Sequence, residues 1–162
     1  MNPTPSPRRS RLAIFGAGPV GQAFAQQFAL LPFVVEVYDT RPPMAEHATI
    51  LSEAELVELA GCLEPGDFAL IVSPTHELDY LLARAVLTSD CFRYCGMLGS
   101  RRKSAEFRVR LAADGVTSDQ LARFSCPLGI PGLGGRAPEV IAVSAAAEVL
   151  ALVQTDEASV SP

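Results

Sequence analysis

The sequence predicts a single α/β domain with a doubly wound, mostly parallel sheet and helices on both of its faces. Short apolar segments alternate with amphipathic helical segments along almost the whole chain, which is the pattern of strands that crossover helices bury on both faces. A glycine-rich turn at Gly16–Gly21 directly follows the first apolar segment. The chain has 162 residues, 49% hydrophobic and 19% charged, and is therefore long and apolar enough for one well-buried core.

The first half of the domain is expected to hold four strands and two helices. Apolar residues at three- and four-residue spacing predict the first helix, and a valine-rich run favours the second strand. Ser52 is a typical N-cap, with glutamates following it in the first turn of the second helix. In order, these elements are strand Leu12–Phe15, helix Gly18–Leu31, strands Phe33–Tyr38 and Ala48–Leu51, a helix after Ser52, and strand Phe68–Val72.

The second half continues the alternation. The expected elements are helix Leu78–Leu87, strand Phe92–Leu98, helix Ser100–Ala113, a helical turn at Ser118–Ala122, strand Arg123–Cys126 and a closing helix at Pro138–Val153. The polar, proline-rich residues 1–10 are predicted to be a disordered leader, and residues 154–162 a polar tail. The folded domain is therefore expected over residues 11–153.

The first glycine motif predicts a Rossmann-like pocket for a dinucleotide. It has the pattern GxGxxG, follows a strand and opens a helix. In that setting the glycines allow a tight turn, close approach of a pyrophosphate and close helix–strand packing, and the helix N-terminus offers free N–H groups to an anion. The alternative is that the glycines serve only the turn. The predicted binding residues are Gly16, Gly18, Pro19, Val20 and Gly21.

Asp39 and Arg41 follow the second strand, where a dinucleotide-binding domain carries its ribose-binding acid. Asp39 is predicted to bind the ribose and to favour NAD over NADP, because its carboxylate would repel a 2′-phosphate. Arg41 either accepts such a phosphate or lies in solvent.

Two further groups are expected at the carboxyl ends of the strands, where ligands bind in such sheets. Gly99, Ser100, Arg101 and Lys103 open a helix with cations in its first turn. Cations are unfavourable there, which points to a compensating anion; the alternative is a basic surface turn. His76 follows the fourth strand and is either a cofactor-binding or proton-transfer group or a loop histidine without chemistry.

A second glycine-rich loop runs from Cys126 to Pro138. Its density of glycine and proline excludes a helix or strand, so its backbone either approaches another group closely or takes positive φ angles. Gly129, Gly134 and Gly135 are predicted to contact a cofactor. Cys126 borders this loop, whereas the other cysteines are expected to be ordinary thiols in a reducing compartment.

Composition and missing motifs narrow the class of protein. With 13 Lys and Arg against 18 Asp and Glu, the chain is not expected to bind nucleic acid. No run of about 18 apolar residues predicts a membrane span, and no signal core is evident, so a cytoplasmic location is expected. We identify no catalytic residue set, no nucleophile elbow and no metal-binding spacing. The sequence thus favours a binding protein over an ordinary enzyme.

The sequence resembles the C-terminal half of the XdhC/CoxI family, accessory proteins for xanthine dehydrogenase and related molybdenum hydroxylases. The similarity runs from about Leu12 to about Leu152. The segments that carry it are Tyr94–Lys103, Phe107–Leu111, Cys126–Gly129 with Gly134-Gly135, and Pro138–Ala142. One departure is Pro74, which stands where the family often has the first histidine of a His-x-His pair; His76 matches the second.

The resemblance implies a chaperone-like role in handling molybdenum cofactor, including its sulfuration and transfer. The cofactor's dinucleotide form would place its pyrophosphate on the first glycine motif and its pterin under the second glycine loop. Implied partners are an apo molybdenum hydroxylase, a cysteine desulfurase and a separate protein supplying the family's N-terminal domain, whose cysteine has no counterpart here. An NAD(P)-dependent oxidoreductase and a nucleotide-sensing module remain the alternatives.

The closing helix also raises the question of a homodimer. Apolar residues lie on more than one of its faces, and Ala145, Ala146 and Ala147 would permit close packing with a second helix. The alternative is that the helix packs against its own sheet.

Overall fold

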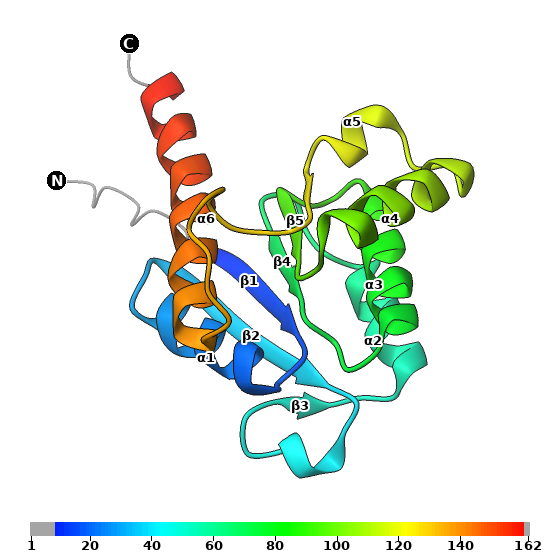
Figure 1. Ribbon diagram of the computed structural model, residues 1–162, viewed down its shortest axis with the longest axis vertical. Helices are drawn as coiled ribbons and strands as arrows, with labels where there is room; N and C mark the ends of the chain where they lie inside the picture. Colours follow the sequence, from blue (N-terminus) through cyan, green and yellow to red (C-terminus); the bar gives the residue numbers. More distant parts are fainter. Residues whose placement is uncertain (1–8, 161–162) are drawn as a thin grey trace, which may run out of the picture.

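The chain folds around one parallel sheet. A computed structural model describes residues 9–160, and within them the sheet has six strands in the order β3-β2-β1-β4-β5-β6, all paired in parallel (Figure 1). This order, with its reversal between β1 and β4, confirms the doubly wound Rossmann-like prediction. The strands are β1 Ser10–Phe15, β2 Phe33–Asp39, β3 Thr49–Ile50, β4 Phe68–Ile71, β5 Tyr94–Met97 and β6 Phe124–Ser125.

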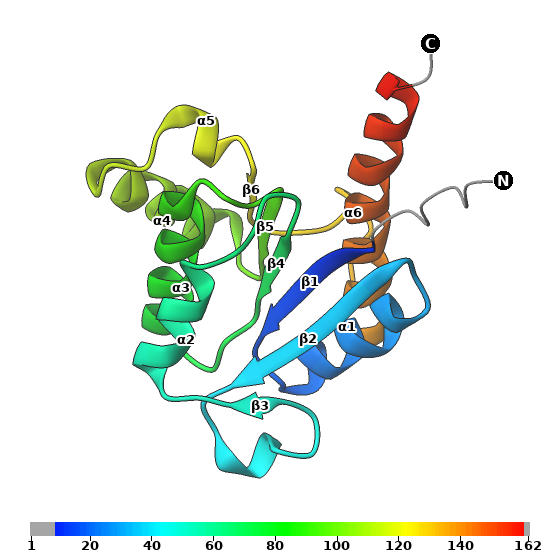
Figure 2. The same cartoon turned by 180° about the vertical axis from the view of Figure 1, so that it is seen from behind.

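Helices cover the two faces of the sheet unequally. α1 and α6 lie on one face, whereas α2, α3 and α4 lie on the other (Figures 1 and 2). The helical elements are α1 Pro19–Ala29, the 3-10 turn η1 Pro42–Met44, α2 Glu53–Ala60, α3 His76–Ser89, α4 Arg101–Ala113, α5 Ser118–Leu121 and α6 Pro138–Val160.

Side-chain alternation along the strands builds two cores. On β1, Leu12 and Ile14 join the α1 and α6 core, whereas Ala13 and Phe15 join the core under α2, α3 and α4. All four are fully buried, because successive side chains of a strand point to opposite faces. A strand buried on both faces therefore reads as a continuous apolar run, which is why β1 and β4 were recognisable.

Several helices differ from the predicted bounds by one or two residues, and α3 and α6 differ in ways that affect the site and the chain end. α3 begins at His76, two residues before the expected start, because the Thr75 side chain accepts a hydrogen bond from the N–H of Leu78 and caps the helix there. α6 continues to Val160, beyond the expected end at Val153, so part of the predicted polar tail is helical. The predicted leader lies mostly outside the described residues, and β1 already begins at Ser10.

Helix α6 is long and apolar. By length and composition alone, its segment Pro138–Thr155 could cross a membrane, and 28% of that segment is buried in the fold. This is a weak indication, since a core helix of a soluble protein meets the same criterion. Ala142, Ala145, Ala146 and Val149 pack on the sheet face shared with α1, as expected for a helix that covers its own sheet.

Candidate functional site

The carboxyl ends of the strands bring together the loops singled out in the sequence. The parallel arrangement places the ends of β1, β2, β4, β5 and β6 at one edge of the sheet, where such folds bind ligands. Three groups of residues there differ in what they can do: the first glycine motif with Asp39 and Arg41, a buried polar cluster beyond β4 and β5, and the second glycine loop beyond β6.

Two glycines of the first motif are required by the fold itself. Gly16 has a φ of +124°, and a Cβ atom there would lie 2.1 Å from the carbonyl oxygen of Val72. A Cβ at Gly21 would lie 1.8 Å from the carbonyl oxygen of Gly16. Any side chain at either position would collide with backbone, so these glycines allow the chain to turn tightly from β1 into α1.

Gly18 is different, because the space in front of it is open. A Cβ there would meet only the guanidinium of Arg41, at 3.7 Å. Gly18 is the N-cap of α1 and has no side chain to accept from the first N–H groups, and Pro19 occupies the first turn. An uncapped helix N-terminus with a cation beside it is suited to bind an anion such as a phosphate.

Asp39 and Arg41 form an ion pair at the end of β2. Arg41 donates to Asp39 from its Nε at 2.9 Å, from a terminal nitrogen at 2.7 Å and from its backbone N–H at 2.8 Å, and the N–H of Ala17 donates at 2.7 Å. Burial opposes ionisation of Asp39, but these hydrogen bonds outweigh it and lower its pKa to about 2. The carboxylate thus ties the glycine loop to Arg41.

This pairing changes the roles expected for both residues. The Asp39 side chain is buried and both of its oxygens are already bonded, so a ribose hydroxyl would have to displace one of these donors. Arg41 neither lies free in solvent nor stands unpaired for a 2′-phosphate. Its half-exposed guanidinium lies between Asp39 and the open space at Gly18.

A buried polar cluster lies beyond β4 and β5. Lys103 Nζ donates to Asp79 at 2.6 Å and to the carbonyl of Leu98 at 3.2 Å, and Ser73 donates to the other Asp79 oxygen from its hydroxyl and its N–H. The side chains of Lys103 and Asp79 are only 11% and 7% exposed. The cations in the first turn of α4 predicted a compensating anion. For Lys103 this anion is the Asp79 carboxylate of the same chain.

Cys126 joins this cluster from the end of β6. It is buried, and its Sγ atom would lie 3.0 Å from a Cβ at Gly99, whose other near neighbour is the Lys103 side chain. Burial raises the pKa of the Cys126 thiol, against the opposing effects of Lys103 and of a hydrogen bond with Ser104. Cys126 is therefore held as a thiol between the β5 and β6 loops.

The remaining predicted residues of this region lie on the surface. Ser100 caps α4 by accepting from the N–H of Lys103, and Arg101 is exposed. His76 is exposed as the first residue of α3, not in a loop. A groove of about 290 Å³ between α3 and α4 brings His76, Ser100 and Lys103 together.

The second glycine loop is fastened to α6. Gly129 and Gly132 have φ angles of +109° and +84°, which glycine adopts without strain. The N–H of Gly129 donates to Glu148, and the N–H of Ile130 donates to the hydroxyl of Ser144 at 2.7 Å. Gly134 has open space around it, whereas a Cβ at Gly135 would press on Val140 at 3.0 Å. The N–H of Leu128 also donates to the carbonyl of Met97 at 3.1 Å, so the loop is fastened to both β5 and α6.

Comparison with known proteins identifies the family. The family model described as the XdhC Rossmann domain matches residues 12–149, which is most of the described fold. The chain belongs to the XdhC Rossmann domain family. This confirms the resemblance drawn from the glycine and cysteine motifs.

Two relatives of this XdhC domain are longer proteins. The protein YqeB of Escherichia coli (strain K12) is 34% identical over 154 residues, covering 88% of this chain and 27% of its own length. A Bacillus halodurans crystal structure described as a xanthine dehydrogenase is 27% identical with a TM-score of 0.75, covering 95% of this chain and 45% of its own. The chain thus spans less than half the length of either.

Sequence reasoning missed several residues that build the site of this XdhC domain. Asp79, Ser73, Ser104 and Glu148 were not among the predicted site residues, yet each anchors a loop or a predicted residue. One signal was present for Asp79: a carboxylate beside Leu78 and Leu82 in an amphipathic helix lies near the apolar face. A charge placed there needs a partner, and Lys103 after the neighbouring strand is that partner.

Proposed function

We propose that this chain is the Rossmann domain of an accessory protein in the maturation of a xanthine dehydrogenase-type molybdenum hydroxylase. We propose further that it binds a pyrophosphate-containing ligand, the dinucleotide form of molybdenum cofactor or NAD(P), at Gly16–Gly21. One observation carries the second proposal: Gly18 leaves open space before an uncapped helix N-terminus, with the Arg41 guanidinium beside it. The family and the likeness to a protein described as a xanthine dehydrogenase support the first.

The residues of the motif fit this ligand class in separate ways. The absence of a side chain at Gly18 leaves room for phosphate oxygens, and the first free N–H groups of α1 would donate to them. Arg41 would neutralise part of the phosphate charge, and Asp39 keeps Arg41 and the Ala17 peptide in place. A bound molybdenum cofactor would itself carry the redox-active metal, as cargo of the domain.

Pairing of the buried charged groups favours a carrier over an oxidoreductase. In the described part of the chain, Asp39 is paired with Arg41 and Asp79 with Lys103. A general acid or base must exchange its proton with the substrate, whereas these two carboxylates are each bonded to a cation of the same chain. His76 would be the remaining proton-transfer candidate for an NAD(P)-dependent reaction.

The proposed partners follow from the accessory role. They are the apo molybdenum hydroxylase, a cysteine desulfurase that supplies sulfur for the cofactor, and a separate protein carrying the N-terminal domain of longer family members. Gly129, Gly134 and Gly135 are proposed to cover the pterin end of the cofactor, and the domain is proposed to act in the cytoplasm.

Direct binding tests the ligand proposal. The purified chain is titrated anaerobically with molybdenum cofactor, and in parallel with NAD and NADP, using calorimetry. Gly18→Val is expected to weaken binding at least tenfold without unfolding the chain, since the fold leaves room for the side chain. Gly61→Ala, at the C-terminal cap of α2, is the matched control. Its new Cβ atom would lie at an ordinary 3.4 Å from its nearest neighbour.

The outcomes separate the alternatives. Cofactor binding that Gly18→Val weakens supports the carrier. Binding of NAD alone, with substrate-dependent reduction, would instead support the oxidoreductase, and NAD binding without turnover would support a sensing module. Failure of all three ligands to bind would overturn the assignment of this motif.

A further inference from the structure

The edge of the sheet at β2 is open over most of its length. β1 pairs with Phe33–Tyr38 on one side of β2, but β3 pairs on the other side only with Tyr38 and Asp39 (Figure 2). Within residues 9–160, the segment Phe33–Val37 therefore has a neighbouring strand on one side alone. At about 3.3 Å per residue, the open edge is roughly 16 Å long.

The free backbone groups of this edge can be assigned from the hydrogen bonds at its end. The N–H of Gly16 donates to the carbonyl of Tyr38 at 2.8 Å, so Tyr38 faces β1. The N–H of Leu51 donates to the carbonyl of Asp39 at 3.0 Å, so Asp39 faces outward to β3. Because the direction alternates along a strand, the peptide groups of Val35 and Val37 face the open edge.

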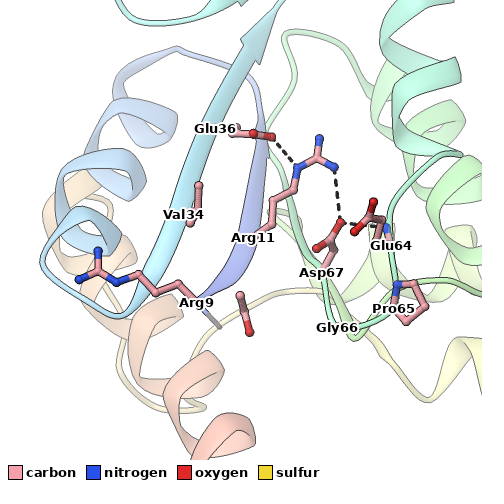
Figure 3. Close-up of a pocket in the computed structure, with 9 residues that line it drawn as sticks. Arg9, Arg11, Val34, Glu36, Glu64, Pro65, Gly66 and Asp67 are labelled. Atoms are coloured by element: carbon pink, nitrogen blue, oxygen red, sulfur yellow. Dashed lines mark hydrogen bonds and ion pairs between the residues drawn. The ribbon is translucent and has the colours of Figure 1, made fainter. Parts of the chain in front are cut away.

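This edge lacks the features that usually protect one. Natural edge strands carry lysine, proline, bulges or inward-pointing charges, whereas Phe33–Val37 is apolar except for Glu36. Glu36 accepts from Arg11 Nε at 2.5 Å (Figure 3). It also accepts from the Tyr38 hydroxyl at 2.7 Å, so its charge is paired within the chain. Val34 is 48% exposed and Leu30, in the turn before β2, is 80% exposed.

Within residues 9–160, no helix covers the face of β2 that carries Val34 and Glu36. Val34 and Glu36 line a pocket of about 530 Å³ at the amino ends of β1, β2 and β4, with Arg11 reaching between Glu36 and Asp67 (Figure 3). A strand added along β2 would therefore meet no obstacle from a helix on this face.

We propose that β2 pairs antiparallel with β2 of a second copy of this chain, around a two-fold axis at Val35. This register places Val35 opposite Val35 and Phe33 opposite Val37, so that the row facing α1 is apolar on both strands. On the other face Val34 lies opposite Glu36, and no like charges oppose each other. The paired segment ends where β3 begins, so each copy fills the open length of the other.

An isologous contact of this kind suits a homodimer. Antiparallel pairing of identical strands is symmetric by construction, and it closes after two copies. The result is one continuous sheet across both subunits, with the open peptide groups of Val35 and Val37 bonded. This differs from a dimer through α6, which the sequence pattern left open as one of two alternatives.

Solution mass and edge variants test the proposal. Sedimentation equilibrium of the wild-type chain at about 100 μM is expected to give twice the 17.2 kDa chain mass. Val35→Pro removes an outward N–H without touching the pairing to β1, as edge prolines do, and is expected to give monomer. Val34→Glu retains every backbone group but places a like charge opposite Glu36 of the second copy, so it should also give monomer and the test survives if the proline variant fails to fold.

A variant on α6 is the matched control. Val143 is 50% exposed there, and Val143→Glu is expected to leave the dimer intact. A monomeric wild-type chain, or a dimer that Val143→Glu dissociates while Val34→Glu does not, would overturn the proposal.

Cross-linking tests the register itself. Directly opposed residues that exchange hydrogen bonds have Cα atoms about 5.5 Å apart, within the range of a disulfide. With the exposed Cys62 and Cys91 replaced by serine, Val35→Cys is expected to form a covalent dimer on mild oxidation, whereas Val143→Cys is not. A dimer in which Val35→Cys stays uncross-linked, or wild-type chain that pairs only with an extended peptide of another protein, would contradict this register and partner.

Discussion

Asp39 occupies the motif position of a ribose-binding acid, but its side chain serves a structural role. Its position after β2 is that of a ribose-binding acid, yet its oxygens are bonded to Arg41 and to the Ala17 peptide. The carboxylate therefore holds the glycine loop and the cation that would meet a phosphate. Its effect on ligand binding is expected to act through Arg41.

The lowered pKa of Asp39 makes stability depend on pH. The folded-state pKa is about 2, below the usual value of about 3.9 for an unfolded chain. The ionised group therefore contributes about 2 kcal/mol above pH about 4, and this contribution is lost as the pH falls toward about 2. Urea unfolding of the wild-type chain and Asp39→Asn across this range should show a shallower pH dependence in the variant. Equal slopes would contradict the assignment.

The glycines of the first motif should separate by stability. Gly16→Ala is expected to cost roughly 3 kcal/mol or more, because it combines a positive φ with a backbone collision. Gly18→Ala should change the free energy of unfolding by less than about 0.5 kcal/mol. Thermal unfolding followed by circular dichroism measures both; similar losses at the two positions would show that Gly18 also has a structural role.

The buried pair of Lys103 and Asp79 should be strongly coupled. Lys103→Met leaves the Asp79 carboxylate buried without its cation and is expected to cost about 3 kcal/mol. Adding Asp79→Asn to that variant should recover at least about 1 kcal/mol, because the uncompensated charge is removed. Urea unfolding of the two single variants and the double variant gives the coupling energy. Additive losses would mean that the two side chains act separately.

At the scale of elements, the second glycine loop depends on α6 for its position. Glu148 accepts from the N–H of Gly129 and from the Ser125 hydroxyl, so it fastens both ends of the turn after β6. Helices α3 and α4 are held in a similar way to each other by Asp79 and Lys103. In both cases the charged side chain of a helix bonds to an element that is distant from it in the sequence.

Removing this anchor should loosen the loop more than the domain. Glu148→Ala is expected to speed hydrogen exchange of the amides at 129–135 at least tenfold, while global stability falls by about 1–2 kcal/mol. Exchange measured by mass spectrometry reports both effects. Glu139→Ala, at an exposed position of the same helix, is the control and should leave the loop's exchange unchanged.

At the scale of the whole molecule, the last helix, α6, completes the core on the sheet face that α1 also covers. The sheet face that carries Leu12, Ile14 and Phe68 is covered by α1 and α6 together. Since α6 follows all six strands in the sequence, that face stays partly exposed until the end of the chain has been added. The fold is therefore cooperative across its full length, although its crossovers are local.

Truncation tests this dependence. A chain ending at residue 137 is expected to lose cooperative thermal unfolding and to bind a hydrophobic dye, because an apolar sheet face is left open. A chain ending at residue 155 retains the buried residues of α6 and should unfold much as the full chain does. Cooperative unfolding of the shorter chain would show that α1 alone suffices.

The sequence by itself determined the fold class, the order of the elements and the loops at the carboxyl ends of the strands. Strands buried on both faces, helix caps such as Ser52 and Ser100, and the glycines that turn the chain at Gly16 act over a few residues. These signals are local, so they can be read from neighbouring positions.

The pairing of charged side chains and the open edge of β2 depend on the tertiary structure. Lys103 and Asp79 are 24 positions apart, and Gly129 and Glu148 are 19 apart. The first pair meets because two crossovers return to the same edge of the sheet, and the second because α6 packs beside the loop that precedes it. The same holds for β2, whose open edge follows from the shortness of β3. Such contacts depend on distances through space, which the spacing along a chain does not specify.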